Sequence, residues 1–358
     1  MRIYDVWLAM TFGSMVSNSA AIISLNLSPM QLYEERKRLH EYDCFTPKQM
    51  TKALEFSIEK AEEILQLHNE NGIKSINYTD AEYPKNFRRM PDAPLVLFYK
   101  GNINLLKNEH KAGVVGTRHP DRDGIKICED LCTALAQNDV TLISGLAQGM
   151  DSIAHRCALN EGADTIAFIG TSCDRYYPAA NRTLQKEIEQ KGCVISEYYM
   201  TQQTYSSAFL ERNRLIAAAG DALCVVQAKS KSGTLSTAKK AQEYSKQLFS
   251  VPGSILNPMH DGTNRLIQDG AYPLLNADDV LLYLGINSED TIKPKNKKPK
   301  LSEIEQKIYD AMGRQTISTG QLFDQTKIPM VQLKALLTKM EMDGVITAKS
   351  PGVFCIKQ

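Results

Sequence analysis

Short segments rich in glycine, hydroxyl and arginine residues recur in the middle of this 358-residue chain. The first is Gly116-Thr117-Arg118, which follows an apolar run and places an arginine near the start of the next predicted helix. An arginine fork and the free amides of a helix N-terminus together attract an anion such as phosphate. The alternative is a surface arginine that only holds its own loop. We favour the anion site.

A second turn, from Ser144 to Asp151, follows the next apolar run and contains Gly145 and Gly149. Glycines let a backbone turn tightly and approach a ligand closely. We interpret Asp151 as a helix cap in preference to a ligand contact, because short polar side chains commonly satisfy the first amides of a helix. His155 has no metal-binding partner nearby in the sequence, so we interpret it as a packed histidine.

The segment from Phe209 to Arg214 joins an aromatic ring to two arginines that flank Asn213. On a helix, Arg212 and Arg214 point in different directions, so one can reach a phosphate while the other pairs with an acid. An exposed Phe209 would stack on a nucleotide base, whereas a buried one would belong to the core.

A hydroxyl-rich turn, Ser232-Gly233-Thr234, opens another predicted helix. Amides of small residues at a helix N-terminus suit a phosphate. The turn lacks the Gly-Lys-Thr sequence of a nucleotide-binding P-loop. Arg182 is a further cation in the loop after Gly170, and its position alone leaves its role open.

These turns need elements that bring them together. Apolar runs alternate with helical stretches between residues 111 and 252, which predicts an α/β fold with a doubly wound, mostly parallel sheet. The six predicted strands are Ala112–Gly116, Val140–Ser144, Thr165–Gly170, Val194–Glu197, Ala222–Val226 and Gln247–Val251. Ligands collect at the carboxyl edge of such a sheet. We therefore expect one positive pocket formed by Arg118, Arg182, Arg212 and Lys246.

The chain divides into four predicted parts. Residues 1–80 form a small helical domain of the SAM or helix-hairpin-helix kind, in which Met50–Asn69 is an amphipathic helix. Residues 81–285 carry the sheet. Residues 286–300 are rich in lysine and proline and are interpreted as a solvated linker in preference to a phosphate-tracking tether. Three helical patterns and a hairpin signal in residues 301–358 predict a winged helix.

Composition limits the class of protein. The hydrophobic fraction is 43%, the charged fraction is 23%, and 42 basic against 41 acidic residues leave a net charge of +1. These values exclude a disordered chain and a uniformly basic nucleic-acid coat. Residues 106–285 carry a net charge of −2 and residues 286–358 one of +4, counted from the sequence. Any binding of nucleic acid by the sheet therefore depends on a few well-placed cations.

The eight cysteines contain no Cys-x-x-Cys pair, which is typical of reduced thiols in a cytoplasmic protein. No apolar run approaches the roughly 18 residues that cross a bilayer, so no membrane insertion is expected. The first ten residues do not resemble a signal peptide. No metal site, cofactor or catalytic residue is predicted.

Taken in order, these motifs resemble the DNA-processing protein A family, also called DprA or Smf. The resemblance covers about residues 80–280. It rests on GTR at 116–118, SGLAQGMD at 144–151, DRYYPAAN at 174–181, FLERNRLIA at 209–217, SGTLSTA at 232–238, VPG at 251–253 and DGTNRLIQDGA at 261–271. The helical start and the winged-helix end are also similar in type.

The resemblance implies a non-catalytic protein with an extended Rossmann-like domain that commonly forms a homodimer. It implies that the protein binds and protects incoming single-stranded DNA and loads the RecA recombinase in natural transformation. The predicted DNA-binding residues combine those that match the family's motifs with the turn glycines and Arg182. They are Gly116, Arg118, Gly145, Gly149, Arg182, Phe209, Arg212, Asn213, Arg214, Ser232, Gly233, Thr234 and Lys246.

The main alternative is a nucleotide phosphoribohydrolase on a related fold. Such enzymes carry a glutamate in the first turn of the helix after the Gly-Thr turn, where this chain has Ser236 and Thr237. A dinucleotide-dependent oxidoreductase is a third alternative, but the chain lacks the GxGxxG turn and the acidic residue that would bind a ribose.

Overall fold

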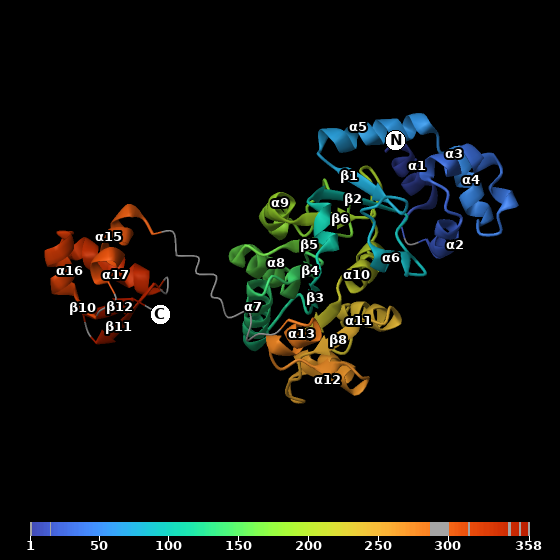
Figure 1. Ribbon diagram of the computed structural model, residues 1–358. Helices are drawn as coiled ribbons and strands as arrows, with labels where there is room; N and C mark the ends of the chain where they lie inside the picture. The colour runs from blue at the N-terminus through green and yellow to red at the C-terminus, as the bar shows by residue number, and fades with distance from the viewer. Residues whose placement is uncertain are drawn as a thin grey trace. The chain divides into compact units, whose positions relative to one another are not determined.

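The computed structural model describes residues 2–14, 16–286, 301–313, 316–342, 345–350 and 352–356 of the chain (Figure 1). Residues 1–291 and residues 292–358 form two compact units. The predicted lysine- and proline-rich linker lies outside the described residues, apart from Ile286.

A mixed sheet forms the centre of the first unit. Within the described residues it has nine strands, in the order β1-β2-β6-β5-β4-β3-β7-β8-β9. Their bounds are β1 Lys74–Asn77, β2 Val96–Gly101, β3 Lys111–Val115, β4 Thr141–Ser144, β5 Thr165–Phe168, β6 Cys193–Ser196, β7 Ala222–Val225, β8 Gln247–Ser250 and β9 Tyr272–Pro273. From β6 to β9 all neighbours are parallel, whereas β1 and β2 are antiparallel at one edge. The prediction of a doubly wound, mostly parallel sheet is therefore confirmed.

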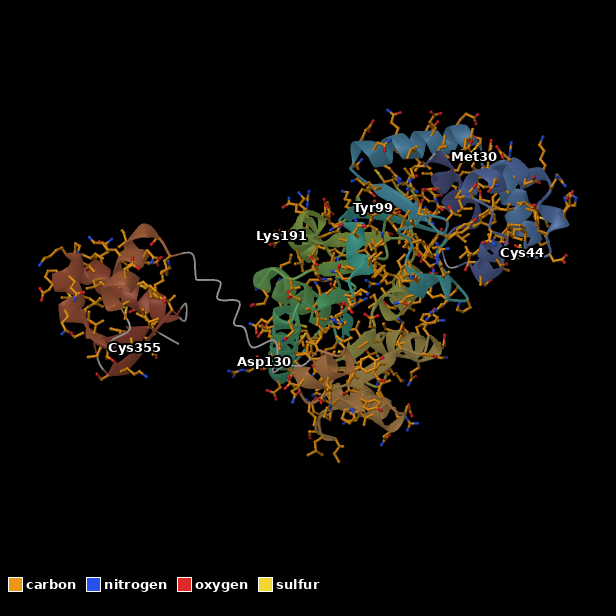
Figure 2. The ribbon with its side chains drawn as sticks, viewed as in Figure 1. Met30, Cys44, Tyr99, Asp130, Lys191 and Cys355 are labelled. Atoms are coloured by element: carbon orange, nitrogen blue, oxygen red, sulfur yellow. The ribbon has the colours of Figure 1, made fainter. Side chains whose placement is uncertain are left out.

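Helices cover both faces of this sheet, which explains why its central parallel strands are completely buried (Figure 1). The main helices are α7 Arg122–Gln137, α8 Met150–Glu161, α9 Arg182–Lys191, α10 Ser207–Ala219, α11 Thr234–Glu243, α12 Asp261–Gln268 and α13 Ala277–Tyr283. Two buried cores result: α7, α8 and α13 pack on one face of the strands, and α10 and α11 pack on the other. Charged side chains such as Asp130 and Lys191 lie on the outer surface of the helices (Figure 2).

The N-terminal residues form helices, as expected, but the predicted single helix Met50–Asn69 is wrong. The helices are α1 Ile3–Phe12, α2 Ser19–Ser24, α3 Pro29–Glu34, α4 Pro47–Glu55 and α5 Ile58–Glu70. Between α4 and α5, Phe56 adopts an extended conformation, and the Ser57 side chain accepts a hydrogen bond from the Lys60 amide. A serine cap that begins a new helix interrupts an otherwise continuous amphipathic pattern. The Phe56 carbonyl that becomes free accepts a hydrogen bond from Nε1 of buried Trp7.

The N-terminal helices share one hydrophobic core with the sheet. His68 in α5 packs edge-on against Phe98 of β2, and its Nε2 accepts a hydrogen bond from the Met200 amide at 3.0 Å. Burial lowers the pKa of His68 to about 4, so the ring is neutral at pH 7 and able to accept. The domain boundary after residue 80 stays a prediction, and β1 lies on its N-terminal side.

The second unit is a winged helix, as predicted. It contains α15 Glu303–Met312, α16 Thr319–Thr326 and α17 Met330–Met342, with the strands β10 Ile317–Ser318, β11 Ile346–Ser350 and β12 Val353–Ile356. The strands pair in the order β10-β12-β11, and the unit has its own apolar core. Ser302 and Ser318 begin α15 and α16 with reciprocal capping bonds to Glu305 and Gln321.

The cysteines form no disulfide bonds in the structure. All eight cysteines are free thiols, and six of them are buried. Among the described residues, none of the helices combines the length and the apolar character that crossing a membrane requires.

Candidate functional site

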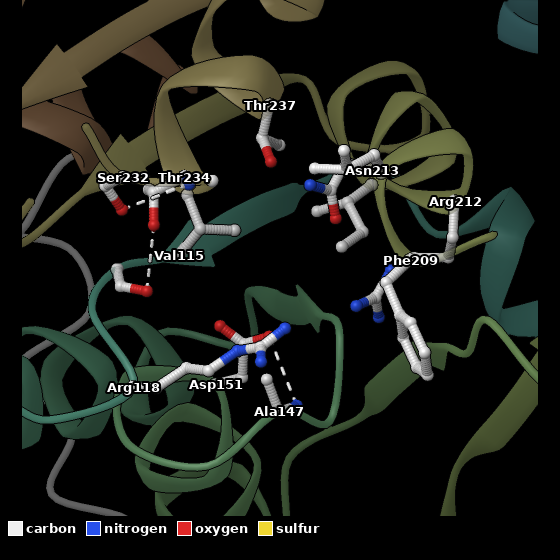
Figure 3. Close-up of a pocket in the computed structure, with 14 residues that line it drawn as sticks. Val115, Arg118, Ala147, Asp151, Phe209, Arg212, Asn213, Ser232, Thr234 and Thr237 are labelled. Atoms are coloured by element: carbon white, nitrogen blue, oxygen red, sulfur yellow. Dashed lines mark hydrogen bonds between the residues drawn. The ribbon is translucent and has the colours of Figure 1, made fainter. Parts of the chain in front are cut away.

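A cavity of about 190 Å³ opens at the carboxyl ends of β3, β4 and β7 (Figure 3). The strand order reverses at β3, and open α/β sheets bind ligands at such a point. Eight of the thirteen predicted DNA-binding residues line this strand-end cavity. They are Gly116, Arg118, Phe209, Arg212, Asn213, Ser232, Gly233 and Thr234.

The anion-binding side of the cavity combines Arg118 with the start of α11. Arg118 is exposed and its side chain extends into the cavity opposite the Ser232–Thr234 turn (Figure 3). The Thr234 hydroxyl donates to the Gly116 carbonyl at 2.9 Å, which ties the turn after β7 to the turn after β3. The Ser232 hydroxyl accepts from the Thr234 amide. The start of α11 and the exposed Arg118 guanidinium thus line the same cavity, and this combination suits a phosphate.

Arg212 has a different role from Arg118, because it is almost completely buried. Only 5% of the residue is exposed, and its Nη1 donates to the carbonyls of Gly145 and Phe168. Gly145 directly follows the last residue of β4, and Phe168 is the last residue of β5. Arg212 therefore joins the ends of these two strands. Burial lowers the pKa of Arg212 to about 10, and the nearby Asp151 carboxylate acts in the opposite direction. The guanidinium therefore remains charged at neutral pH beside the cavity.

The turn after β4 is shaped by two glycines. A Cβ at Gly145 would collide with the Arg212 guanidinium, and a Cβ at Gly149 would collide with the backbone of Thr117 and Arg118. Gly149 also has a φ of 77°, which side-chain-bearing residues rarely adopt. The two glycines therefore let the turns after β3 and β4 approach each other, and Gly145 also lines the second cavity beside Phe209.

Asp151 is not a helix cap, so that interpretation is wrong. The cap position of α8 belongs to Gly149, and no side chain caps the helix. Asp151 Oδ2 instead accepts from the amides of Gly145 and Ala147, at 3.2 and 3.3 Å. Only 7% of Asp151 is exposed, and it lines the strand-end cavity. Burial raises the pKa of this carboxyl group, while Arg212 and the two amides oppose that rise.

Arg214 lies away from the cavity, although it is only two residues from Arg212. Its exposed fraction is 1%, its Nη2 donates to Glu197 at 2.6 Å, and its Nε lies 3.8 Å from Asp92. The expectation that one arginine of this segment pairs with an acid therefore fits Arg214. A buried, paired guanidinium has no surface left for a phosphate, so the DNA-binding role predicted for Arg214 is not supported by its position.

Phe209 forms the wall between the strand-end cavity and a smaller neighbouring cavity of about 60 Å³. The second cavity is also lined by Tyr177, whose ring centroid lies 4.9 Å from that of Phe209. Tyr177 is 53% exposed. The two rings together form an aromatic rim that the sequence prediction only half identified. The signal for Tyr177 was an aromatic residue directly before the proline of the loop after β5.

Arg182 and Lys246 do not join the cavity. Arg182 is exposed at the start of α9, and its guanidinium lies over the Tyr176 ring at 5.1 Å from the centroid. Lys246 directly precedes β8, so it lies at the amino edge of a parallel sheet, near Lys111 and Asp221. The expectation that both converge with Arg118 and Arg212 on one pocket is therefore wrong. For Lys246 the cause is simple, because a residue before a parallel strand lies at the opposite edge from a residue after one.

Thr237 is a lining residue that was not predicted, and it lies on the same side of the cavity as Asn213 (Figure 3). Asn213 Nδ2 donates to the Ser236 hydroxyl at 3.1 Å, which holds α10 against α11. Apolar side chains of Val115, Leu210 and Ile216 complete the lining. An anion side, apolar walls and a few polar groups are typical of a site for a nucleotide.

The fold and the cavity define an α/β protein with a Rossmann-like sheet and a candidate anion site at its carboxyl edge. Residues 74–285 match the family model described as DNA recombination-mediator protein A, and residues 293–351 match the DprA winged helix domain. The chain belongs to the DNA recombination-mediator protein A family, which includes DprA and Smf. It is therefore a DNA-processing protein of the recombination-mediator class.

Relatives agree with this assignment. The chain is 42% identical over 207 residues to the DNA processing protein DprA of Streptococcus pneumoniae, covering 58% of this chain and 73% of that one. It is 33% identical over 221 residues to DprA of Bacillus subtilis, covering 62% and 74%. Among solved structures, DprA of Streptococcus pneumoniae superposes with a TM-score of 0.69 and 33% identity, covering 79% of this chain and 98% of that one. DprA of Helicobacter pylori, whose single-stranded DNA binding mode has been described, gives 0.54 and 34% identity, covering 59% and 95%.

The buried position of Arg212 leads to a stability prediction. Replacing Arg212 by alanine should lower the free energy of unfolding by roughly 3 kcal/mol, because two buried carbonyls lose their donor. Urea unfolding followed by circular dichroism measures this change. Replacement of exposed Arg118 by alanine is the matched control and should change stability by less than about 0.5 kcal/mol. Equal stability of the two variants would contradict the strand-joining role of Arg212.

Proposed function

We propose that this protein binds single-stranded DNA at the strand-end cavity. The observation that carries the proposal is the convergence of Arg118, the α11 N-terminus and the Phe209–Tyr177 aromatic rim at one edge of the sheet. A phosphate would lie between Arg118 and the Gly233 amide, and bases would stack on the exposed part of the aromatic rim. Single-strand binding needs this combination of cations and stacking surfaces. The described binding mode of the Helicobacter pylori relative supports the same ligand.

A rigid framework supports such a site. The Thr234–Gly116 hydrogen bond ties the turns after β3 and β7 together, and the Arg212 hydrogen bonds tie the ends of β4 and β5 together. A site held by the sheet loses little entropy when the flexible strand binds. The sheet region has a net charge of −2, so we expect it to contact few phosphates. The affinity should then fall by roughly 0.7 log units per contacted phosphate for each tenfold rise in salt concentration, which is a modest salt dependence.

We also propose that the protein protects incoming single-stranded DNA and loads the RecA recombinase onto it in the cytoplasm. The family description as a recombination mediator supports this role, and the eight free cysteines fit a reducing compartment. The winged helix is the accessory part. The exposed start of its α17 carries the apolar residues Met330 and Val331, and Lys339 is held by Glu305. This composition favours a protein contact over a DNA contact.

The protein is further proposed to form a homodimer through the edge of the sheet at β9. Exposed apolar side chains gather here: Tyr272, Leu275, Leu282 and Tyr283 are 50–73% exposed. Tyr272 and Tyr283 both contact the ring of Phe249, so they belong to one surface. An apolar surface beside a sheet edge is typical of a subunit interface.

A phosphoribohydrolase remains the alternative function, and one feature of the cavity bears on it. The first turn of α11 carries Ser236 and Thr237 where such enzymes carry glutamate, although Asp151 lines the same cavity. Asp151 is engaged by two backbone amides and lies in the turn after β4. Release of a free base from nucleoside monophosphates by the purified protein would favour the enzyme over the DNA-binding protein.

Replacing Arg118 by alanine should weaken binding of a labelled single-stranded oligonucleotide by roughly 1–3 kcal/mol, about 5- to 150-fold, because a charged phosphate contact is lost. Fluorescence anisotropy at a fixed moderate salt concentration measures the affinity. Arg156 is exposed on α8 outside both cavities, so Arg156→Ala is the matched control and should bind normally. An unchanged affinity of Arg118→Ala, or a preference of the wild type for duplex, would refute the site.

Removal of residues 291–358 should leave the affinity for single-stranded DNA within about twofold, because the cavity lies entirely in the first unit. RecA loading is measured separately, as the rate at which RecA becomes active in ATP hydrolysis on protein-covered single strands. The full-length protein should raise this rate. If it has no effect at any ratio of protein to DNA, the proposed loading role is wrong.

Replacing Leu282 by glutamate should convert the dimer to a monomer, because a charge in the middle of an apolar interface is desolvated without a partner. Sedimentation velocity over a range of concentrations reports the oligomeric state. Leu54→Glu, at a 60% exposed apolar position on α4, is the control and should not change it. A wild-type protein that sediments as a monomer at all concentrations would rule out the homodimer.

A further inference from the structure

We propose that the strand-end cavity reads the base of a bound nucleotide and that Asp151 makes it prefer guanine. The inference rests on the proposed binding of single-stranded DNA at this cavity, and adds a base preference at one position of the strand. Neither the phosphate contacts nor the aromatic rim would produce such a preference, because they bind any nucleotide.

The first argument is the placement of the Asp151 carboxylate. Asp151 lines the cavity while only 7% of the residue is exposed, so its carboxylate faces enclosed space and little solvent. Oδ2 accepts from the amides of Gly145 and Ala147, and Figure 3 shows the bond to Ala147. Each carboxylate oxygen accepts about two hydrogen bonds, so the two amides occupy Oδ2, and the Ser144 side chain also interacts with the carboxylate, while Oδ1 keeps acceptor positions. Capacity therefore remains for donors supplied by a ligand.

The second argument is the shape and polarity of the surrounding wall. The cavity measures about 190 Å³, and cavities of about 150 Å³ take up a benzene-sized ring. Val115, Phe209 and Ile216 supply apolar surface for the faces of a planar ring. A buried carboxylate at the end of an apolar cavity selects a flat ligand that has N–H groups on its edge.

The third argument is the pattern of donors on the four bases. Guanine presents N1–H and the 2-amino group side by side, and both can donate to Oδ1, because the two backbone amides already occupy Oδ2. Adenine and cytosine present one amino group beside an acceptor nitrogen, and thymine presents N3–H between two carbonyl oxygens. These acceptors repel a carboxylate.

The wild-type protein provides the main test. Unlabelled dGMP, dAMP, dCMP and dTMP compete with a labelled oligothymidine for the full-length protein, and anisotropy gives the four inhibition constants. We expect dGMP to bind at least about tenfold more tightly than dTMP, with dAMP and dCMP between them. An oligothymidine with one central guanine should also bind more tightly than the all-thymine strand of equal length.

Asp151→Asn tests whether this side chain is the cause. The amide oxygen can keep both backbone N–H bonds, while the amide nitrogen turns an acceptor into a donor. The preference for dGMP should disappear, and affinity for xanthosine 5′-monophosphate, which has a carbonyl where guanine has its amino group, should rise. Asp123 is an exposed acid in the first turn of α7, so Asp123→Asn is the matched control and should keep the preference for dGMP.

The outcomes separate the two proposals. If the wild type binds oligothymidine but does not distinguish the four nucleotides, base reading by Asp151 is wrong and single-strand binding stands. If a folded Asp151→Asn variant still prefers dGMP, Asp151 does not read the base. The same conclusion holds if GMP and dGMP differ in affinity as much as dGMP and dTMP do, because GMP and dGMP differ only in the ribose 2′-hydroxyl. If no single-stranded DNA binds, the proposed function fails, and this inference fails with it. Should Asp151→Asn not fold, the wild-type nucleotide series decides alone.

Discussion

The site depends on one buried interaction, in which the Arg212 guanidinium donates to the backbone carbonyls of Gly145 and Phe168. It joins the ends of two neighbouring parallel strands and brings a fixed positive charge next to the Asp151 carboxylate. Because an unpaired charge or carbonyl would be costly at this depth, the strand ends, the glycine turn and α10 must all keep one geometry. Gly145 is small for this reason, since a Cβ there would occupy the space of the guanidinium.

Two arginines two residues apart on α10 consequently do different work. Successive residues on a helix are about 100° apart, so Arg212 and Arg214 point to nearly opposite sides. Arg212 reaches the strand ends, whereas Arg214 joins Glu197 and Asp92 in a buried ion pair under the other side of the helix. Among the described residues that line the cavity, Arg118 is the exposed arginine and Arg212 the buried one. Within the segment Phe209–Arg214, Phe209 contributes to the candidate ligand site, whereas Arg212 and Arg214 stabilise the fold around it.

Much of the architecture could be predicted from the sequence. Six of the seven parallel strands, the doubly wound order and the winged helix follow from apolar runs that alternate with helices, because local patterns decide them. The strands β1, β2 and β9 were not predicted, because their pairing with distant segments is not encoded in a local pattern. The break between α4 and α5 was also missed, because the serine cap at Ser57 outweighs an amphipathic pattern that continues through it.

For the site, the sequence by itself determined which residue types were available: small turns, arginines, hydroxyls and an aromatic residue at strand ends. The tertiary structure alone decided their use. It placed Lys246 at the opposite sheet edge, buried Arg214 in an ion pair, kept Arg182 on Tyr176, and turned Asp151 from an expected cap into a cavity wall. The physical reason is that burial and the sheet edge on which a side chain lies depend on packing between distant segments, which no local pattern contains.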